Sequence, residues 1–432
     1  MTAAAAAAVI GGGLSGALQA IHLIREGAKK VVLIERARTP GRGVAYGTDR
    51  PEHLLNVPAR RMSAFPDEPD HFVRWYAKRG GTAEDFAPRM LFGDYVVELL
   101  GAIDGRLEIV RGEAVDVEGG DVALADGRRI AAEAVVLAPG NLPPATPRGI
   151  DPQALGALWV ADPWAGAMAG GLGEGDTILL VGTGLTAIDA ALTLEANGFG
   201  GRILALSRRG LVPRAHGLRE PMTEPQEKLP SNCVGLLRRV RLRSGEIGWR
   251  SAVHELRNAT QAIWGDAPAS ERQRFLRHLR PWWDVHRHKI APAVGATIGR
   301  MQAEGRLSFA AGRILSIDPD GTVRWRPRGA ERSETARVAR IFNCTGPELD
   351  IVRAGEPLLD ALIARGRIRP DPLRIGLDVD RDCRALDAAG TRSDALYAVG
   401  PVTRGTFWES VAVPDIRVQA QGVARQILRS GS

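Results

Sequence analysis

Short apolar runs that end in glycine turns recur along the chain, and they set the expected fold. The clearest are residues 5–10 and 178–181, and a longer segment with helical periodicity begins after the glycines that follow each run. A short apolar run bounded by turn residues is typical of a buried strand, and apolar positions three or four apart are typical of a helix. The pattern predicts an α/β fold that contains two strand–turn–helix units.

The glycines of these two turns share one spacing, Gly11-x-Gly13-x-x-Gly16 and Gly182-x-Gly184-x-x-Ala187. In this spacing the first glycine permits a tight turn, and the second lets the backbone approach a pyrophosphate. The third small residue lets the helix pack on the strand, and the N–H groups at the start of the helix face the anion. Two such motifs in this context predict two Rossmann-like dinucleotide-binding domains; a single one would also suit an ordinary glycine-rich turn.

The strand after each motif ends differently, which predicts two different dinucleotides. Residues 30–34 lead to Glu35, about twenty residues after the first glycines, where a carboxylate binds a ribose diol and repels a 2′-phosphate. Residues 203–206 lead to Ser207-Arg208-Arg209, and a hydroxyl with two guanidiniums suits a 2′-phosphate. We expect FAD at the first site and NADPH at the second. The alternative is that Arg208 and Arg209 are ordinary surface arginines.

The order of the remaining segments predicts a discontinuous FAD-binding domain. Its first part is residues 1–150 and its second part is residues 340–432, with an NADP-binding domain at residues 151–339 between them. A basic segment with tryptophans, about residues 213–292, is expected to be a largely helical insertion. Further strands are expected at residues 107–110, 114–117, 122–125, 133–140, 307–317, 322–326, 339–347 and 396–401, and further helices at residues 70–79, 93–100 and 413–428.

Composition narrows the class of protein. The 432 residues are 44% hydrophobic and 25% charged, as in a globular enzyme of two or three domains. The net charge is +7, but no nucleic-acid motif accompanies the basic clusters at residues 238–250 and 272–289, so attraction of anionic ligands or a solvated helix face is expected. The apolar start carries a glycine motif and lacks a basic leader. We therefore expect no membrane span, no nucleic-acid partner and a cytoplasmic location.

Three cysteines, Cys233, Cys344 and Cys383, are too far apart for a disulfide framework or a zinc site. A flavin-linked disulfide reductase needs a cysteine pair near the flavin, and the segments expected there have none. The sequence also shows no Ser/His/Asp, Cys/His or metal-binding constellation. This suits a protein whose bound flavin supplies the redox chemistry.

Several longer motifs resemble one flavoprotein family. They are Gly41-Arg-Gly-Val-Ala-Tyr-Gly47, His53-Leu-Leu-Asn56-Val-Pro-Ala59, Arg61-Met-Ser-Ala-Phe65, Trp282-Trp-Asp-Val-His286-Arg-His288, Asn343-Cys-Thr-Gly-Pro347 and Gly400-Pro-Val-Thr-Arg-Gly-Thr-Phe-Trp408-Glu. Through them the chain resembles the FAD/NAD(P)-binding group that includes a bacterial FAD-dependent urate hydroxylase and a nitrosuccinate-forming aspartate N-monooxygenase. The resemblance implies FAD, NADPH, O₂ and a small-molecule substrate, and it does not choose between urate and aspartate.

These motifs supply the candidate site residues. The predicted cofactor contacts are Gly11, Gly13, Ser15, Gly16, Glu35, Arg36, Tyr46, His53, Asn56, Met62, Gly140, Gly182, Gly184, Thr186, Ser207, Arg208, Arg209, Gly346, Gly400 and Trp408. Asn56, His53 and Trp408 are also candidates beside the reacting flavin, although His53 and Asn56 could merely tie their loop and Trp408 could fill the core. Trp283, Arg287 and His288 place aromatic surface beside cations, which suits an anionic substrate or the NADPH phosphates; the alternative is a helix with core tryptophans and solvated cations.

The sequence therefore predicts an FAD- and NADPH-dependent oxidoreductase. The favoured function is a flavin monooxygenase that hydroxylates nitrogen or carbon of a small polar or anionic substrate, such as an amino acid or a purine. Two alternatives stay open at this point: a non-oxygenating NAD(P)H–flavin oxidoreductase, and a dinucleotide-binding redox sensor without turnover.

Overall fold

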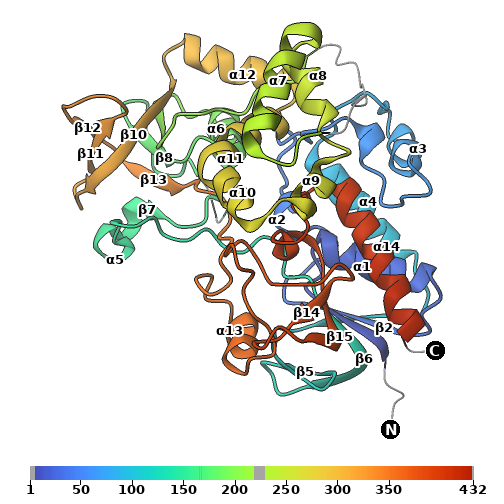
Figure 1. Cartoon of the computed structure of the whole chain (residues 1–432). Helices are drawn as coiled ribbons and strands as arrows, with labels where there is room; N and C mark the ends of the chain where they lie inside the picture. Colours follow the sequence, from blue (N-terminus) through green and yellow to red (C-terminus); the bar gives the residue numbers. More distant parts are fainter. Residues whose placement is uncertain (1–4, 165, 167, 218–228, 431–432) are drawn as a thin grey trace.

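Two sheets with helices on their faces make up the molecule in the computed structural model, which describes residues 5–164, 166, 168–217 and 229–430 (Figure 1). The first sheet has the order β14-β15-β6-β1-β2-β3, and a hairpin of β4 and β5 joins it through β6. Its strands are β1 (Ala5–Ile10), β2 (Val31–Glu35), β3 (Leu107–Arg111), β4 (Ala114–Glu118), β5 (Asp121–Leu124), β6 (Arg129–Leu137), β14 (Arg384–Leu386) and β15 (Arg392–Ala398). The central strands β1, β2, β3, β6 and β15 run parallel.

Apolar side chains cover both faces of the first sheet, which explains why its strands are nearly continuous apolar runs. One face packs on α1 (Leu14–Arg25), α4 (Arg89–Gly101) and α14 (Val413–Ser430), and α1 lies directly against α14. The other face is covered by α13 (Pro357–Ala364) and by the β4–β5 hairpin. Short helices α2 (Gly43–Tyr46), η1 (Ala59–Arg61) and α3 (His71–Ala77) lie between β2 and α4 in sequence. The predicted C-terminal helix thus packs on the first domain.

The second sheet has the order β12-β11-β10-β9-β8-β13-β7. Its strands are β7 (Trp159–Val160), β8 (Thr177–Val181), β9 (Arg202–Ser207), β10 (Leu307–Ile317), β11 (Thr322–Pro327), β12 (Glu334–Arg337) and β13 (Arg340–Asn343). Strands β7, β13, β8, β9 and β10 are parallel, whereas β10, β11 and β12 form an antiparallel extension that projects from the body of the molecule (Figure 1). Helices α6 (Leu185–Ala196) and α12 (Pro292–Ala303) pack together on this sheet.

Helices fill the described part of the segment between β9 and α12. They are α7 (Cys233–Ile247), α8 (Trp249–Glu255), α9 (Thr260–Asp266), α10 (Ala269–Arg274), the π turn η3 (Phe275–Leu279) and α11 (Arg280–Arg287). They reach the C-terminal part of the chain, because the indole of Trp264 donates to Gly405 O at 2.8 Å and Gln261 Nε2 donates to Thr406 O at 2.9 Å. The insertion therefore contacts the loop that leads into α14.

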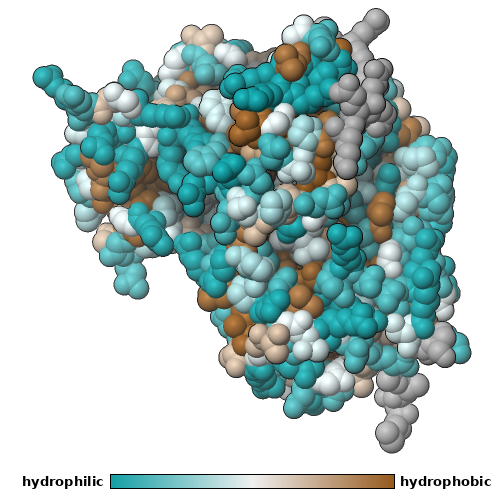
Figure 2. Space-filling view, in the orientation of Figure 1, coloured by the Kyte–Doolittle hydropathy of each residue, from teal (hydrophilic) through white to brown (hydrophobic). Residues whose placement is uncertain are grey.

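The predicted α/β fold with two Rossmann-like units is confirmed, but the domain boundary predicted at residue 340 needs correction. Strand β13 begins at that residue and pairs with β8 and β7 of the second sheet. The sequence of β13 resembles that of β6, a strand that runs into a glycine, and this pattern does not say which sheet the strand joins. The rest of the three-part division stays a prediction. The face of the molecule seen in Figure 2 is largely hydrophilic, with apolar side chains in small patches.

Candidate dinucleotide and substrate sites

The first glycine turn is shaped so that only glycine fits at its two ends. Gly11 has φ +97°, and a Cβ there would lie 2.3 Å from the carbonyl oxygen of Ala138. A Cβ on Gly16 would lie 1.8 Å from the carbonyl oxygen of Gly11, so α1 touches the turn directly. Helix α1 begins after Gly13, and no side chain caps it. Its first N–H groups are therefore available to an anion.

Glu35 lies beside this turn, as its spacing predicts. Its carboxylate accepts hydrogen bonds from the backbone N–H groups of Gly12, at 2.5 Å, and Ala37, at 2.7 Å. These bonds fix the carboxylate at the end of β2, next to the start of α1. By contrast, the neighbouring Arg36 points to the carboxylates of Glu356, at 2.7 Å, and Glu113, at 3.4 Å. To contact the cofactor as the sequence predicts, the Arg36 side chain would have to give up these two ion pairs.

The second glycine turn repeats this geometry. Gly182 has φ +129°, and a Cβ there would lie 2.2 Å from the carbonyl oxygen of Cys344, as Gly11 lies against Ala138. Gly184 is exposed, nothing lies within 4 Å of where its Cβ would be, and no side chain caps α6. Thr186 lies in the first turn of α6. The start of α6 is thus an open, uncapped helix N-terminus of the kind that receives a phosphate.

Two of the three residues predicted to bind a phosphate at the end of β9 are engaged within the protein. Arg209 turns away and donates to the carbonyl oxygens of His278, at 3.3 Å, and Arg277, at 3.2 Å. The Ser207 hydroxyl lies 2.9 Å from the Thr183 hydroxyl and accepts from the Gly210 N–H at 3.0 Å, so it holds the turn together. Of the three predicted phosphate contacts, only Arg208 has a side chain that is exposed and makes no bond within the described part of the chain.

Arg208 instead lies in a groove of about 190 Å³ with three arginines of the β10–β11 hairpin, Arg313, Arg326 and Arg328. All four are exposed, and none has an ion pair or side-chain hydrogen bond within the described part of the chain. Arg313 and Arg326 are direct cross-strand partners, an arrangement of like charges that is unfavourable without an anion. The sequence alone does not point to these three residues, because only the pairing of β10 with β9 brings the hairpin beside Arg208.

The segment at residues 46–62 is more structural than predicted. His53 is buried, its Nδ1 lies 2.9 Å from the Thr48 hydroxyl, and its Nε2 lies 2.9 Å from the Thr193 hydroxyl of α6. Burial lowers the pKa of His53, so the ring is neutral at neutral pH. These contacts favour the alternative that His53 ties its loop, here to the second domain. The half-buried Asn56 side chain makes no hydrogen bond in the described structure, so its amide is available to a ligand.

Two further residues of this segment pack inward. Tyr46 lies against Phe92 with ring centroids 4.9 Å apart, and burial raises the pKa of its hydroxyl to about 12. Met62 is 2% exposed and belongs to the core between the sheet and its helices. Close by, Arg89 and the buried Asp189 form a bidentate ion pair that joins α4 to α6, with guanidinium nitrogen to carboxylate oxygen distances of 2.7 and 2.9 Å.

The glycines that follow strands β6 and β13 lie near the segment where the chain passes between the two domains. Gly140 (φ +73°) follows β6 and Gly346 (φ +84°) follows β13, and both have free space where a Cβ would be. Gly400 (φ +80°) begins η4 (Gly400–Thr403), and a Cβ there would lie 2.2 Å from Ser15 Oγ. Only glycine thus lets η4 approach the start of α1.

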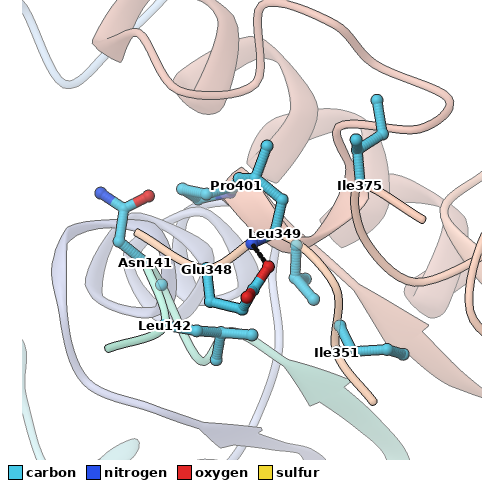
Figure 3. A pocket seen from close by; sticks show the side chains of 9 residues that line it. Asn141, Leu142, Glu348, Leu349, Ile351, Ile375 and Pro401 are labelled. Atoms are coloured by element: carbon cyan, nitrogen blue, oxygen red, sulfur yellow. Dashed lines mark hydrogen bonds between the residues drawn. The ribbon is translucent and has the colours of Figure 1, made fainter. Parts of the chain in front are cut away.

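A small cavity lies beside this crossing (Figure 3). Asn141, Leu142, Glu348 and Pro401 are among its lining residues, and Glu348 accepts a hydrogen bond from the N–H of Leu349 at 2.9 Å. Its volume of about 10 Å³ suffices for one water molecule and excludes a substrate.

The predicted substrate residues come together with Trp408. Arg287 of α11 donates to the carboxylate of Glu409 at 2.9 Å, and both side chains are largely buried. Burial, with the charge of Arg287 beside it, lowers the pKa of His288 to about 4. Trp408 is 2% exposed and lies 4.7 Å from Trp264, centroid to centroid. Trp408 therefore packs in the interface with the insertion, which favours the alternative that it fills the core. Arg287 is not a solvated cation.

The cysteines are unsuited to redox chemistry. Cys233, Cys344 and Cys383 are all free and buried. Burial raises the pKa of Cys233 to about 11 and that of Cys383 to about 12, and it raises the pKa of Cys344 still further. All three thiols are protonated at neutral pH, and the thiolate is the reactive form.

Among the described helices, none combines the length and the apolarity needed to cross a membrane.

Comparisons with known proteins agree with the first site. Residues 8–142 match a protein family described as FAD-NAD(P)-binding, which identifies this segment as an FAD/NAD(P)-binding region. No curated protein matches the chain in sequence.

Many solved structures share the fold. An ornithine N-hydroxylase from Kutzneria sp. 744, with reduced FAD, NADP⁺ and L-ornithine, is 16% identical with a TM-score of 0.66, and 100% of each chain is covered. The FAD-bound cadaverine monooxygenase of desferrioxamine biosynthesis from Erwinia amylovora is 14% identical with a TM-score of 0.69, covering 99% of this chain and 95% of that one. Thioredoxin reductase from T. acidophilum is 13% identical with a TM-score of 0.52, covering 99% and 98%. At these identities the comparison shows that the chain shares the fold of these proteins.

Proposed function

We propose that the protein is an FAD-dependent, NADPH-using monooxygenase that hydroxylates a small polar or anionic substrate. The observation that carries this proposal is the pair of uncapped helix N-termini at two glycine turns. Glu35 lies beside one of them, and Arg208 with its neighbouring arginines lies beyond the other. A carboxylate suits the ribose of FAD, and a cationic groove suits the 2′-phosphate of NADPH.

The residues present fit both cofactors. Gly11, Gly13 and the start of α1 would hold the pyrophosphate of FAD, with Glu35 on its ribose; Gly182, Gly184 and the start of α6 would hold that of NADPH. Bound FAD would accept a hydride from NADPH and use O₂ as the electron acceptor. The overall change is balanced: substrate, O₂, NADPH and H⁺ give hydroxylated substrate, NADP⁺ and water. Asn56, whose side-chain amide has no hydrogen-bond partner among the described residues, is a candidate to orient the flavin or the substrate.

The buried thiols argue against a protein disulfide as the acceptor of the flavin's electrons and support O₂ in that role. The same architecture occurs in a thioredoxin reductase, but here each cysteine is isolated and protonated. The similarity in fold to an ornithine N-hydroxylase favours nitrogen over carbon as the site of reaction. The resemblance to the urate hydroxylase and aspartate N-monooxygenase group supports the same class of enzyme, and membership of that particular group stays a prediction.

The test is NADPH oxidation by the purified, FAD-loaded protein in air, with a panel of amino acids and purines. We expect one substrate to accelerate NADPH oxidation and to replace released peroxide with a hydroxylated product. If the protein oxidises NADPH but releases one peroxide per NADPH with every compound, it is a non-oxygenating oxidoreductase. If FAD-loaded protein oxidises no NADPH at all, a redox sensor without turnover takes the place of both enzymes.

A further inference from the structure

Residues 53–56 lie between β2 and α4 in sequence, but it is the second domain that holds them. His53 Nε2 lies 2.9 Å from the Thr193 hydroxyl and 3.2 Å from the carbonyl oxygen of Asp189, and both of these residues belong to α6. The Leu54 side chain packs against the apolar core of the second sheet. One end of this segment is thus attached to a helix that covers the other sheet.

Arg89 strengthens the same attachment. Its Nε donates to the carbonyl oxygen of Leu54 at 3.1 Å, while its two terminal nitrogens donate to the carboxylate of Asp189 at 2.7 and 2.9 Å. The Asp189 side chain is buried, and a bidentate pair of this kind adds geometric specificity as well as energy. The guanidinium therefore bridges the segment and α6 with three hydrogen bonds.

The other end of the segment is held as well. His216, which follows β9, donates from Nε2 to the carbonyl oxygen of Asn56 at 3.0 Å, and its ring lies 5.0 Å from that of Phe86, centroid to centroid. The backbone of Asn56 is thereby fixed, whereas its half-buried side-chain amide has no hydrogen-bond partner among the described residues. Contacts with the second domain thus present this amide to a ligand.

Helix α6 also carries the second glycine turn. Its uncapped N-terminus follows Gly184, and Asp189 and Thr193 lie further along the same helix. A helix rises about 1.5 Å per residue, so the eight residues from Leu185 to Thr193 span only about 12 Å. One short helix therefore connects the proposed NADPH phosphate site with the segment that carries Asn56.

We propose that His53 is a positioning residue for flavin reduction. By attaching residues 53–56 to α6, it fixes the segment that carries Asn56 relative to bound NADPH. The inference rests on the proposed function, in which NADPH is the reductant and Asn56 is a candidate flavin contact, and it deepens that function by giving His53 a role at a distance from the flavin. Hydride transfer is sensitive to such a role, because the reacting atoms must lie about 3–3.5 Å apart and a misplacement of about 1 Å can cost about a hundredfold in rate.

The test is anaerobic reduction of the FAD-loaded protein by NADPH, followed by stopped-flow absorbance. This experiment separates the reduction rate at saturating NADPH from the dissociation constant of NADPH. His53→Leu removes both ring nitrogens, and we expect the rate to fall by about tenfold to a hundredfold while the dissociation constant and the FAD content change by less than about twofold. His53→Gln keeps a polar group that can reach the Thr193 hydroxyl and should recover most of the rate. The control His71→Leu removes a half-buried histidine that bonds Tyr95 within the first domain, and it should be reduced at the wild-type rate.

Charge-transfer absorbance gives a readout that does not depend on turnover. When NADP⁺ is added to protein reduced with dithionite, a long-wavelength band arises only if the nicotinamide and flavin rings overlap. We expect this band to be weaker in His53→Leu than in the wild type and to return in His53→Gln. Equal bands in the wild type and His53→Leu would count against a positioning role.

The inference is overturned if folded, FAD-loaded His53→Leu is reduced at the wild-type rate, if only the dissociation constant of NADPH changes, or if His53→Gln is as impaired as His53→Leu. Should His53→Leu lose its fold or its FAD, Thr193→Val decides the question, because it removes the partner hydroxyl from α6. A lower reduction rate in Thr193→Val would then support the inference, and an unchanged rate would overturn it.

Failure of the proposed function would look different. Wild-type protein that takes up FAD but is not reduced by NADPH would refute the proposed function itself. Slow reduction in His53→Leu, with no hydroxylated product from the wild type, would leave this inference intact and refute the monooxygenase.

Discussion

Coenzyme preference should be set by the groove of four arginines at the end of β9, and not by Arg208 and Arg209 together. The perturbation is Arg208→Ala combined with Arg313→Ala, which removes one guanidinium from β9 and one from the β10–β11 hairpin. Arg324→Ala is the matched control, because Arg324 is exposed on the same hairpin but does not line the groove.

The expected size of the effect follows from the exposure of these side chains. A hydrogen bond to a charged group contributes about 1.5–3 kcal/mol, and an exposed one falls at or below the low end. Taking about 1.4 kcal/mol for each lost guanidinium gives a tenfold loss in NADPH affinity per residue and about a hundredfold loss for the pair, if the two are additive. NADH lacks the 2′-phosphate, so its affinity should change by less than about twofold. The preference should also weaken with salt, because exposed charges are screened over about 10 Å at 0.1 M ionic strength.

The assay is anaerobic reduction of the bound flavin, followed by loss of absorbance at saturating and subsaturating NADPH and NADH. We expect the ratio of the flavin-reduction rates with NADPH and NADH to fall in the double variant and to be unchanged in Arg324→Ala. Arg209→Ala should also leave the ratio largely intact, because Arg209 bonds the carbonyl oxygens of residues 277 and 278. An unchanged ratio in the double variant would show that the groove does not receive the 2′-phosphate.

Three further predictions concern the cofactor, the thiols and the domain contact. Glu35→Arg should purify with little FAD, because it removes the carboxylate bonded to Gly12 and adds a cation at the ribose. The control Glu118→Arg changes an exposed residue and should remain fully yellow. Full flavin content in Glu35→Arg would contradict the assignment of FAD to the first site. Triple replacement of Cys233, Cys344 and Cys383 by alanine should leave NADPH-driven flavin reduction intact in the folded protein, and its complete loss would implicate a thiol. Arg89→Met should lower the free energy of unfolding, measured in urea, by about 3 kcal/mol, because it leaves Asp189 buried and unpaired. Arg106→Met should cost much less, because its pair with Asp104 is exposed; equal costs would be inconsistent with a structural role for the Arg89–Asp189 pair.

The features that depend on neighbours in sequence were predictable. The glycine spacings place two turns and two helix starts, and Glu35 arrives beside Gly12 because one strand–helix–strand unit has a nearly fixed length. The helices at residues 71–77 and 413–430 and the strands of the β4–β5 hairpin follow from local periodicity and turn residues.

The features that depend on tertiary pairing were not predictable. Arg313, Arg326 and Arg328 join Arg208 only because β10 pairs with β9, and about a hundred residues separate them in sequence. The assignment of β13 to the second sheet, and of His53 to a tie with α6, also rest on contacts between distant segments.

The most direct test of the monooxygenase is the fate of molecular oxygen. FAD-loaded protein would be supplied with NADPH, ¹⁸O₂ and the compound that most accelerates NADPH oxidation, and the product would be analysed by mass spectrometry beside a peroxide assay. We expect a product heavier by one ¹⁸O atom, formed in near-equal amount to the NADPH consumed, with little peroxide. Unlabelled substrate recovered intact, with one peroxide for each NADPH, would contradict it.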